Sequence, residues 1–147
     1  MSLKEQIRSD MKAAMRAGEK DRLGVIRMLL AAIQTREIDK REDLADSEVL
    51  QVVEKLIKQR KDAAQQYADA DRPDREAQEL GEAEQLQAYL PEQLSETELE
   101  QMVTDVIASS GAASMKDMGQ VMAAIRAQAQ GRADMGSLSA LVKSKLS

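Results

Sequence analysis

Apolar residues recur at three- and four-residue spacing along nearly the whole chain, and this pattern limits the fold more than any other feature. Ile26, Leu30 and Ile33 form one such stripe, which is typical of an amphipathic helix. Val, Ile and Thr never gather into alternating runs bounded by turn residues, so the sequence predicts no β-strand. We therefore expect an all-α protein. Its core must be aliphatic, because the 147 residues include two Tyr and no Phe or Trp.

Seven helices are predicted from these stripes and from the residues that break them. They cover, to within a few residues, positions 2–17, 20–38, 46–68, 74–90, 95–109, 115–129 and 137–146. Pro91 interrupts the pattern, and a new stripe starts after it. We expect an N-terminal helical domain with a long helix at residues 1–91, and a small C-terminal three-helix bundle at residues 92–147.

Short polar residues mark the expected helix starts. Ser2 and Ser95 are each followed three residues later by Glu, which is the pattern of a capping box. We expect Asp46 or Ser47 to cap the long third helix and Ser137 to cap the last helix.

Glycines mark several of the expected helix ends. Gly18, Gly111 and Gly131 follow helical stripes and suit left-handed C-cap positions, because glycine has no Cβ to clash there. Gly24 lies inside a helix, where it costs roughly 1 kcal/mol relative to Ala, so we expect close helix packing around it.

The composition excludes several kinds of active site. The chain has no Cys and no His, so disulfides, thiolate nucleophiles, Cys/His zinc sites and the commonest general base are all absent. No Gly-rich phosphate loop is present, and the acidic residues at 39–46 lack the EF-hand pattern. We expect no catalytic residue, no cofactor and no metal. With neither a signal-like apolar run nor a membrane-length stretch, we expect no membrane association and a cytoplasmic location.

Charge is spread unevenly over the chain, whose net charge is −5. Residues 1–41 carry +4, residues 42–105 carry −12, and residues 106–147 carry +3. The acidic total argues against non-specific nucleic-acid binding, whereas the basic ends allow a local contact with RNA. Solvated helix faces explain the same charges without a partner. The basic cluster at residues 58–61, in an otherwise acidic segment, is kept as a surface candidate.

The C-terminal segment carries a recognisable signature, MG-x-VM followed by GRAD and then LVK. Its residues are Met118, Gly119, Val121, Met122, Gly131, Arg132, Ala133, Asp134, Leu141, Val142 and Lys143. This signature resembles the tail of the GatB/YqeY family, and YLPEQLSETEL at residues 89–99 resembles the hinge between that family's two helical domains. The resemblance covers essentially the whole chain and indicates a free-standing YqeY-like protein, because the catalytic domain of the GatB subunit is absent. Many members follow GRAD with Gly-Lys, whereas this chain has Met135 and Gly136.

The resemblance implies a contact with tRNA, because the related tail domain of the GatB amidotransferase subunit helps to hold its tRNA. Such contacts would be to phosphates and shape, since base stacking needs aromatic side chains. The cations available for them are Lys116, Arg126, Arg132, Lys143 and Lys145. Structural roles explain the same residues without RNA: Gly119 in close helix packing, Gly131 as a C-cap, Arg132 paired with Asp134, and Asp134 as the cap of the last helix.

Three functional hypotheses follow. The first is a tRNA-associated binding module or accessory factor without an active site of its own, partnered by tRNA or by a protein of tRNA metabolism. The second is a protein–protein interaction module that uses Met-rich or Ala-rich helix faces. The third is a component of a glutamine-dependent amidotransferase, for which the family-level activity is that of a carbon–nitrogen ligase with glutamine as amido-N-donor. The sequence leaves the tRNA species and the oligomeric state open.

Overall fold

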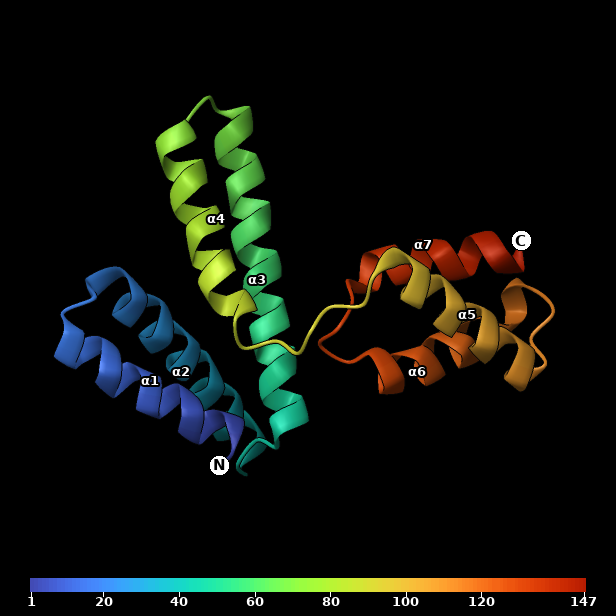
Figure 1. The fold of residues 1–147 in the computed structure, drawn as a ribbon, viewed down its shortest axis with the longest axis horizontal. Coiled ribbons are helices and arrows are strands. Elements are labelled where there is room, and N and C mark those ends of the chain that lie inside the picture. Colours follow the sequence, from blue (N-terminus) through green and yellow to red (C-terminus); the bar gives the residue numbers. More distant parts are fainter. The chain divides into compact units, whose positions relative to one another are not determined.

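A computed structural model describes all residues, 1–147, and confirms the all-α prediction. Seven α-helices and one 3₁₀ turn are present, with no strand (Figure 1). Their bounds are α1 Leu3–Ala17, α2 Lys20–Lys40, α3 Asp46–Asp69, α4 Pro73–Gln87, α5 Glu96–Ser110, η1 Met115–Asp117, α6 Met118–Ala129 and α7 Met135–Leu146. The chain forms two compact units, Met1–Leu90 and Pro91–Ser147, which we call unit 1 and unit 2.

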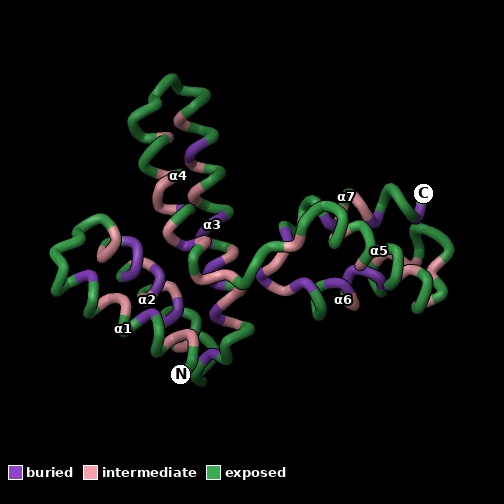
Figure 2. The backbone as a smooth tube through the Cα atoms, in the orientation of Figure 1, coloured by how far each residue is buried: buried purple, intermediate pink, exposed green.

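Unit 1 consists of two helical hairpins, α1–α2 and α3–α4, whose short connections make consecutive helices antiparallel (Figure 1). Its core is aliphatic, and Ile7, Leu29 and Val53 are fully buried in it. Figure 2 colours the backbone by burial and shows buried positions on α1, α2 and α3. The second half of α3, which is poor in large apolar residues, lies along α4 and buries Ala64. Arg60 of α3 also reaches Glu79 and Glu82 of α4, each at 3.5 Å, so charge pairing adds to the packing where apolar side chains are few.

The capping boxes predicted at Ser2 and Ser95 are confirmed. The Ser2 hydroxyl accepts from the Glu5 N–H at 3.1 Å, and the Glu5 carboxylate accepts from the Ser2 N–H at 3.2 Å. Ser95 and Glu98 repeat this arrangement at the start of α5. In both cases two N–H groups that lack helical partners are satisfied by residues close in sequence.

The cap predicted for α3 is wrong, because the helix already begins at Asp46, with Ala45 as its N-cap residue. Glu48 accepts the Ala45 N–H at 3.2 Å and supplies half of a capping box. The Asp46 carboxylate instead accepts the Leu3 N–H at 3.1 Å, so it satisfies the first turn of α1. The local sequence therefore suggested a cap at Asp46, whereas the Asp46 side chain binds a residue far away in the sequence.

The glycine predictions divide into two groups. Gly18 and Gly111 have φ values of 69° and 71° and are the C-caps of α1 and α5, which confirms two of the predicted left-handed helix ends. Gly131 is also left-handed, with φ of 74°, but the C-cap of α6 is Gln130, so the C-cap predicted at Gly131 is wrong. Gly24 is exposed, and a Cβ placed on it would meet no atom within 4 Å. The close helix packing expected at Gly24 is therefore wrong, because the glycine lies on the outer face of α2.

Unit 2 packs α5, α6 and α7 against one another around Val103, Ile125 and Leu138, all fully buried. Before α6 the chain makes the 3₁₀ turn η1, so α6 begins later than predicted. The last helix begins at Met135, two residues before Ser137, so the cap predicted at Ser137 is wrong. None of the helices in the two units combines the length and apolar character needed to cross a membrane.

Candidate functional site

The GRAD segment of the tail signature forms the turn between α6 and α7 and holds the chain that enters unit 2. The Gly131 carbonyl accepts from Gln93 Nε2 at 2.6 Å, and the Arg132 carbonyl accepts from the Leu94 N–H at 2.8 Å. Arg132 Nε donates to the Glu92 carbonyl at 3.1 Å. Three hydrogen bonds thus join residues that are about 40 positions apart in sequence, and the turn anchors residues 92–94.

The last two residues of GRAD also have structural roles. Ala133 is buried, and Asp134 is the N-cap of α7, where its carboxylate accepts the Ser137 N–H at 2.9 Å and the Ser137 hydroxyl at 3.0 Å. Of the roles left open by the sequence, the structure therefore assigns Asp134 as the cap of the last helix. The Arg132 guanidinium is directed to the Glu92 carbonyl.

A groove of about 460 Å³ lies beside this turn in unit 2. Arg132 is its one cation, whereas Glu96, Glu100 and Asp134 each contribute a carboxylate. The hydrogen bonds at Ser95 lower the pKa of neighbouring Glu98, and the charge on Arg132 adds a smaller effect in the same direction. The groove is acidic on balance, so it disfavours a phosphate.

The five cations proposed for RNA binding are placed in two different ways. Lys145 reaches Glu100 of α5 at 3.5 Å, and Arg132 is held at the turn. Lys116, Arg126 and Lys143 are exposed and have no ion pair; we call these three the tail cations. Lys143 and Lys145 lie two positions apart on α7, which puts them about 200° apart around the helix.

The first part of the tail signature packs the core of unit 2. Val121 and Met122 are buried, and Met118 packs against the same cluster. Gly119, however, is exposed, and a Cβ there would meet no atom within 4 Å. Close helix packing around Gly119 is therefore absent within unit 2.

In unit 1 the basic cluster at residues 58–61 is not uniformly free. Arg60 is partly buried and bonded to two glutamates of α4, whereas Lys58 and Lys61 are exposed. The cluster therefore supplies two surface cations and one cation that holds the α3–α4 hairpin.

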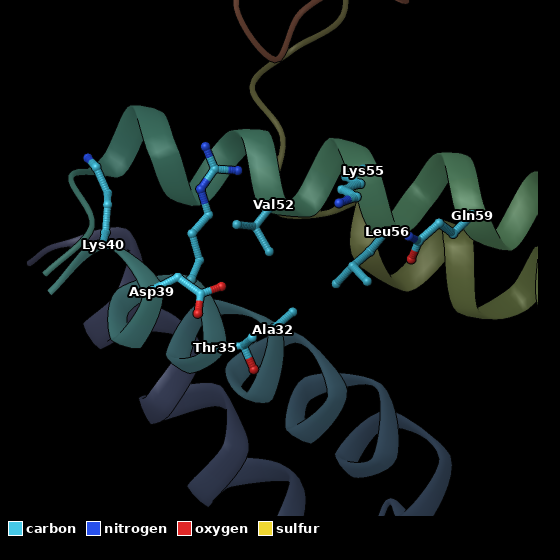
Figure 3. Close-up of a pocket in the computed structure, with 9 residues that line it drawn as sticks. Ala32, Thr35, Asp39, Lys40, Val52, Lys55, Leu56 and Gln59 are labelled. Carbon is cyan, nitrogen blue, oxygen red and sulfur yellow. The ribbon is translucent and has the colours of Figure 1, made fainter. Parts of the chain in front are cut away.

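A second groove, of about 610 Å³, lies between α2 and α3 (Figure 3). Val52 and Leu56 form its apolar side. Two of its three cations are engaged: Arg36 donates to Gln51 at 3.2 Å, and Lys40 pairs with Glu48. Lys55 makes no ion pair, so the groove offers one free positive charge to a ligand.

The acidic residues at 39–46 do not form a metal site. No three carboxylates come together as possible ligands. Glu42 pairs with Lys40 at 3.1 Å, Asp43 lies 3.6 Å from Lys4, and Asp46 accepts from the backbone of α1. These side chains join the ends of α1, α2 and α3.

Two further polar interactions tie α1 into unit 1. The Glu37 carboxylate accepts from Lys4 Nζ at 2.6 Å and from the Leu44 N–H at 3.0 Å, and these two bonds, chiefly the first, lower the pKa of Glu37. Tyr89 donates its hydroxyl to Asp10 at 2.7 Å. Burial, reinforced by Asp10, raises the pKa of the Tyr89 phenol.

One group of cations on α1 was missed by the sequence analysis. Lys4, Arg8, Lys12 and Arg16 follow one another at intervals of four residues, and all four belong to α1. The signal was present in the sequence as a four-residue period of positive charge. The total charge of residues 1–41 does not show on which side of a helix the cations lie, so the group was not recognised.

Comparison with known proteins decides the family. The sequence profile of a family described as "Yqey-like protein" matches residues 4–146. The chain belongs to this family. The match includes both units, so the tail signature and the α1 cations lie within the matched residues.

Two fungal relatives resemble this family member. The first, "Altered inheritance of mitochondria protein 41, mitochondrial" from Vanderwaltozyma polyspora, is 31% identical over 120 residues, which cover 76% of this chain and 64% of that protein. This chain thus spans less than two thirds of that relative's length. The second, "Uncharacterized protein C22F3.15" from Schizosaccharomyces pombe, is 30% identical over 94 residues, covering 64% of this chain and 76% of that protein.

Proposed function

We propose that this Yqey-like protein is a tRNA-associated binding module or accessory factor that has no active site of its own. The observation that carries the proposal is the tail signature, in and near which three cations are exposed without ion pairs. The likeness to the tRNA-holding tail of the GatB subunit supplies the class of partner.

The interaction is electrostatic and directed at phosphates. Unit 2 offers Lys116, Arg126 and Lys143 to solvent but no aromatic side chain for base stacking, since both Tyr residues belong to unit 1. Phosphate contacts position a protein on RNA without reading its sequence. We therefore expect binding to several tRNA species, with an affinity that falls as salt rises.

The test is fluorescence anisotropy of labelled total tRNA with the purified chain over a series of salt concentrations. The tail variant, Lys116→Gln with Arg126→Gln and Lys143→Gln, removes the three tail cations. The slope of log K against log salt should become shallower by about 0.7–0.9 for each phosphate that the variant no longer neutralises. Absence of tRNA binding to the unmodified chain at low salt would refute the proposal.

A charge-matched control separates a local interaction from the effect of net charge. Arg22→Gln, Lys40→Gln and Arg72→Gln, introduced together, also remove three positive charges. Each of these cations already faces a carboxylate, namely Glu19, Glu48 or Asp74. We call this triple variant the paired-cation control and expect its salt slope to stay close to that of the unmodified chain.

The other hypotheses have distinct tests. A component role in an amidotransferase requires glutamine-dependent ammonia transfer that appears only when this chain is added to the other components. A protein–protein interaction module would capture a partner protein that stays bound after RNA is digested, whereas a strictly monomeric chain that captures no partner would count against this hypothesis. We also propose a cytoplasmic location, which fractionation of the source cells would test.

A further inference from the structure

The basic residues of α1 form a row along its solvent-facing side. Lys4, Arg8, Lys12 and Arg16 are separated by four residues each, so successive members are about 6 Å apart along the axis and turn by about 40°. Ile7 and Ala14 are fully buried in the core of unit 1, and on a helical wheel they lie about 140–180° from Lys12 and Arg16 but closer to Lys4. Because the apolar side faces inward, the later members of the row face solvent.

Three members of this row make no ion pair. Lys4 is held between Glu37 and Asp43, at 2.6 and 3.6 Å. Arg8, Lys12 and Arg16, by contrast, are exposed and unpaired; we call these three the α1 row. A stretch of about two helical turns thus presents three cations that make no ion pair, although the charge of Arg8 is close enough to Glu37 to help lower the pKa of that carboxyl.

The carboxylates of α1 itself are engaged elsewhere. Glu5 accepts the Ser2 N–H at the first turn of the helix, and Asp10 accepts the Tyr89 hydroxyl at 2.7 Å. On a helical wheel Asp10 falls beside the buried side of α1, about 160° from Lys12. On the same wheel Glu5 falls on the side of the α1 row, about one turn before Arg8, so this face of α1 carries three cations against one carboxylate and stays positive on balance.

We propose that the α1 row is a second phosphate-binding surface for RNA, contributed by unit 1. The inference rests on the proposed function for the class of ligand, but it concerns residues outside the tail signature. A row of cations spaced by helical turns can neutralise several phosphates of one RNA strand at once. A single small anion would contact only one or two of these cations.

A lipid surface fits these residues less well than RNA does. A helix that lies on a membrane buries bulky apolar side chains in the lipid and keeps its cations above them. The apolar side of α1 is used in the core of unit 1, and Met15 is the only large apolar residue of α1 that is mainly exposed, at 52%. The surface is therefore suited to a soluble polyanion.

The experiment compares four forms of the full chain on the same labelled tRNA across a salt series. The forms are the unmodified chain, the tail variant, the paired-cation control, and an α1 variant that carries Arg8→Gln, Lys12→Gln and Arg16→Gln. Glutamine has a helix propensity close to those of Arg and Lys, so α1 should keep its structure, and far-UV circular dichroism verifies this. The slope of log K against log salt should become shallower by about 2–3 in the α1 variant, while the control changes little.

The outcomes separate this inference from the proposed function. If tRNA binds and the α1 variant behaves like the paired-cation control, the α1 row is not a phosphate site, although the proposed function stands. If the tail variant binds tRNA as the unmodified chain does while the α1 variant loses binding, the α1 row is a phosphate-binding surface and the tail cations are not. No binding by the unmodified chain overturns both.

A parallel measurement addresses the membrane alternative. Vesicles of phosphatidylcholine with added phosphatidylserine are sedimented with the unmodified chain and with the α1 variant. Vesicle binding that depends on the α1 row, without a matching effect on tRNA, would overturn the inference in favour of a lipid surface. We expect no difference between the two forms in this assay.

Discussion

Gly24→Ala should stabilise unit 1, although the sequence pattern pointed to the opposite. Gly24 lies within α2 and is exposed, and a Cβ placed there would meet no atom within 4 Å. Glycine inside a helix costs about 1 kcal/mol relative to Ala, because it loses more backbone freedom on folding. With no steric cost to oppose this gain, the free energy of unfolding should rise by about 1 kcal/mol.

The chain provides a selective probe for this measurement. Its two Tyr residues, Tyr67 and Tyr89, both belong to unit 1, so tyrosine fluorescence follows the unfolding of that unit alone. For a domain of 60–100 residues, about 1 kcal/mol corresponds to a rise of roughly 4–8 °C in Tm. The Tyr89 hydroxyl is bonded to Asp10 of α1, which makes the signal sensitive to the α1–α2 hairpin.

Gly18→Ala is the matched control, because it makes the same chemical change at a different backbone conformation. Gly18 ends α1 with φ of 69°, where a Cβ is strained, so this variant should be destabilised by about 1–2 kcal/mol. A destabilised Gly24→Ala variant would refute our reasoning. It would mean that another surface packs closely on α2, as the sequence had suggested.

Three further predictions concern hydrogen bonds and charges. Asp134→Ala should cost unit 2 about 1 kcal/mol in urea unfolding followed by far-UV circular dichroism, whereas Asp134→Asn should retain most of the cap; equal losses in both would argue against capping. Because the pKa of Glu37 is lowered from its ordinary value of 4.5, its charged form stabilises the folded protein at pH values above 4.5, and this contribution is lost as pH falls through the lower pKa of the folded state. Acid titration followed by tyrosine fluorescence should show the loss, and Glu37→Gln should remove that part of the pH dependence. Arg60→Ala should cost about 1–3 kcal/mol because it leaves two glutamates of α4 facing each other. Adding Glu79→Gln and Glu82→Gln should recover part of that loss, and no recovery would contradict the assigned pairing.

Much of the secondary structure could be predicted from the sequence because its causes are local. The boxes at Ser2 and Ser95 involve residues three positions apart, and Gly18 and Gly111 end helices through their own backbone conformation. Asp46 shows the limit of such reasoning. Its partner, the Leu3 N–H, is 43 positions away, and no local pattern distinguishes that hydrogen bond from an N-cap.

The candidate site was predictable in part. The tail signature led to the family, but its hydrogen bonds with residues 92–94 depend on how the α6–α7 turn packs, which spacing does not reveal. Burial was misjudged at Gly24 for a related reason: a helical period shows which residues share a face, but not whether a neighbour covers a glycine. The α1 row was missed although its four-residue spacing is visible in the sequence, because the total charge of a segment does not show which cations share one side of a helix.

The hydrogen bonds at the GRAD turn also limit the number of residues that can move freely between the two units. Tyr89 is fixed to unit 1 through Asp10, and Glu92 is fixed to unit 2 through Arg132. Only Leu90 and Pro91 lie between these anchors, and the proline ring restricts one of their torsions. When two binding units are joined so closely, binding at the first makes binding at the second intramolecular, with an effective concentration that depends on whether one ligand can span both sites. If the tail cations and the α1 row both bind one RNA, the two phosphate surfaces would then act with the avidity of a bivalent binder.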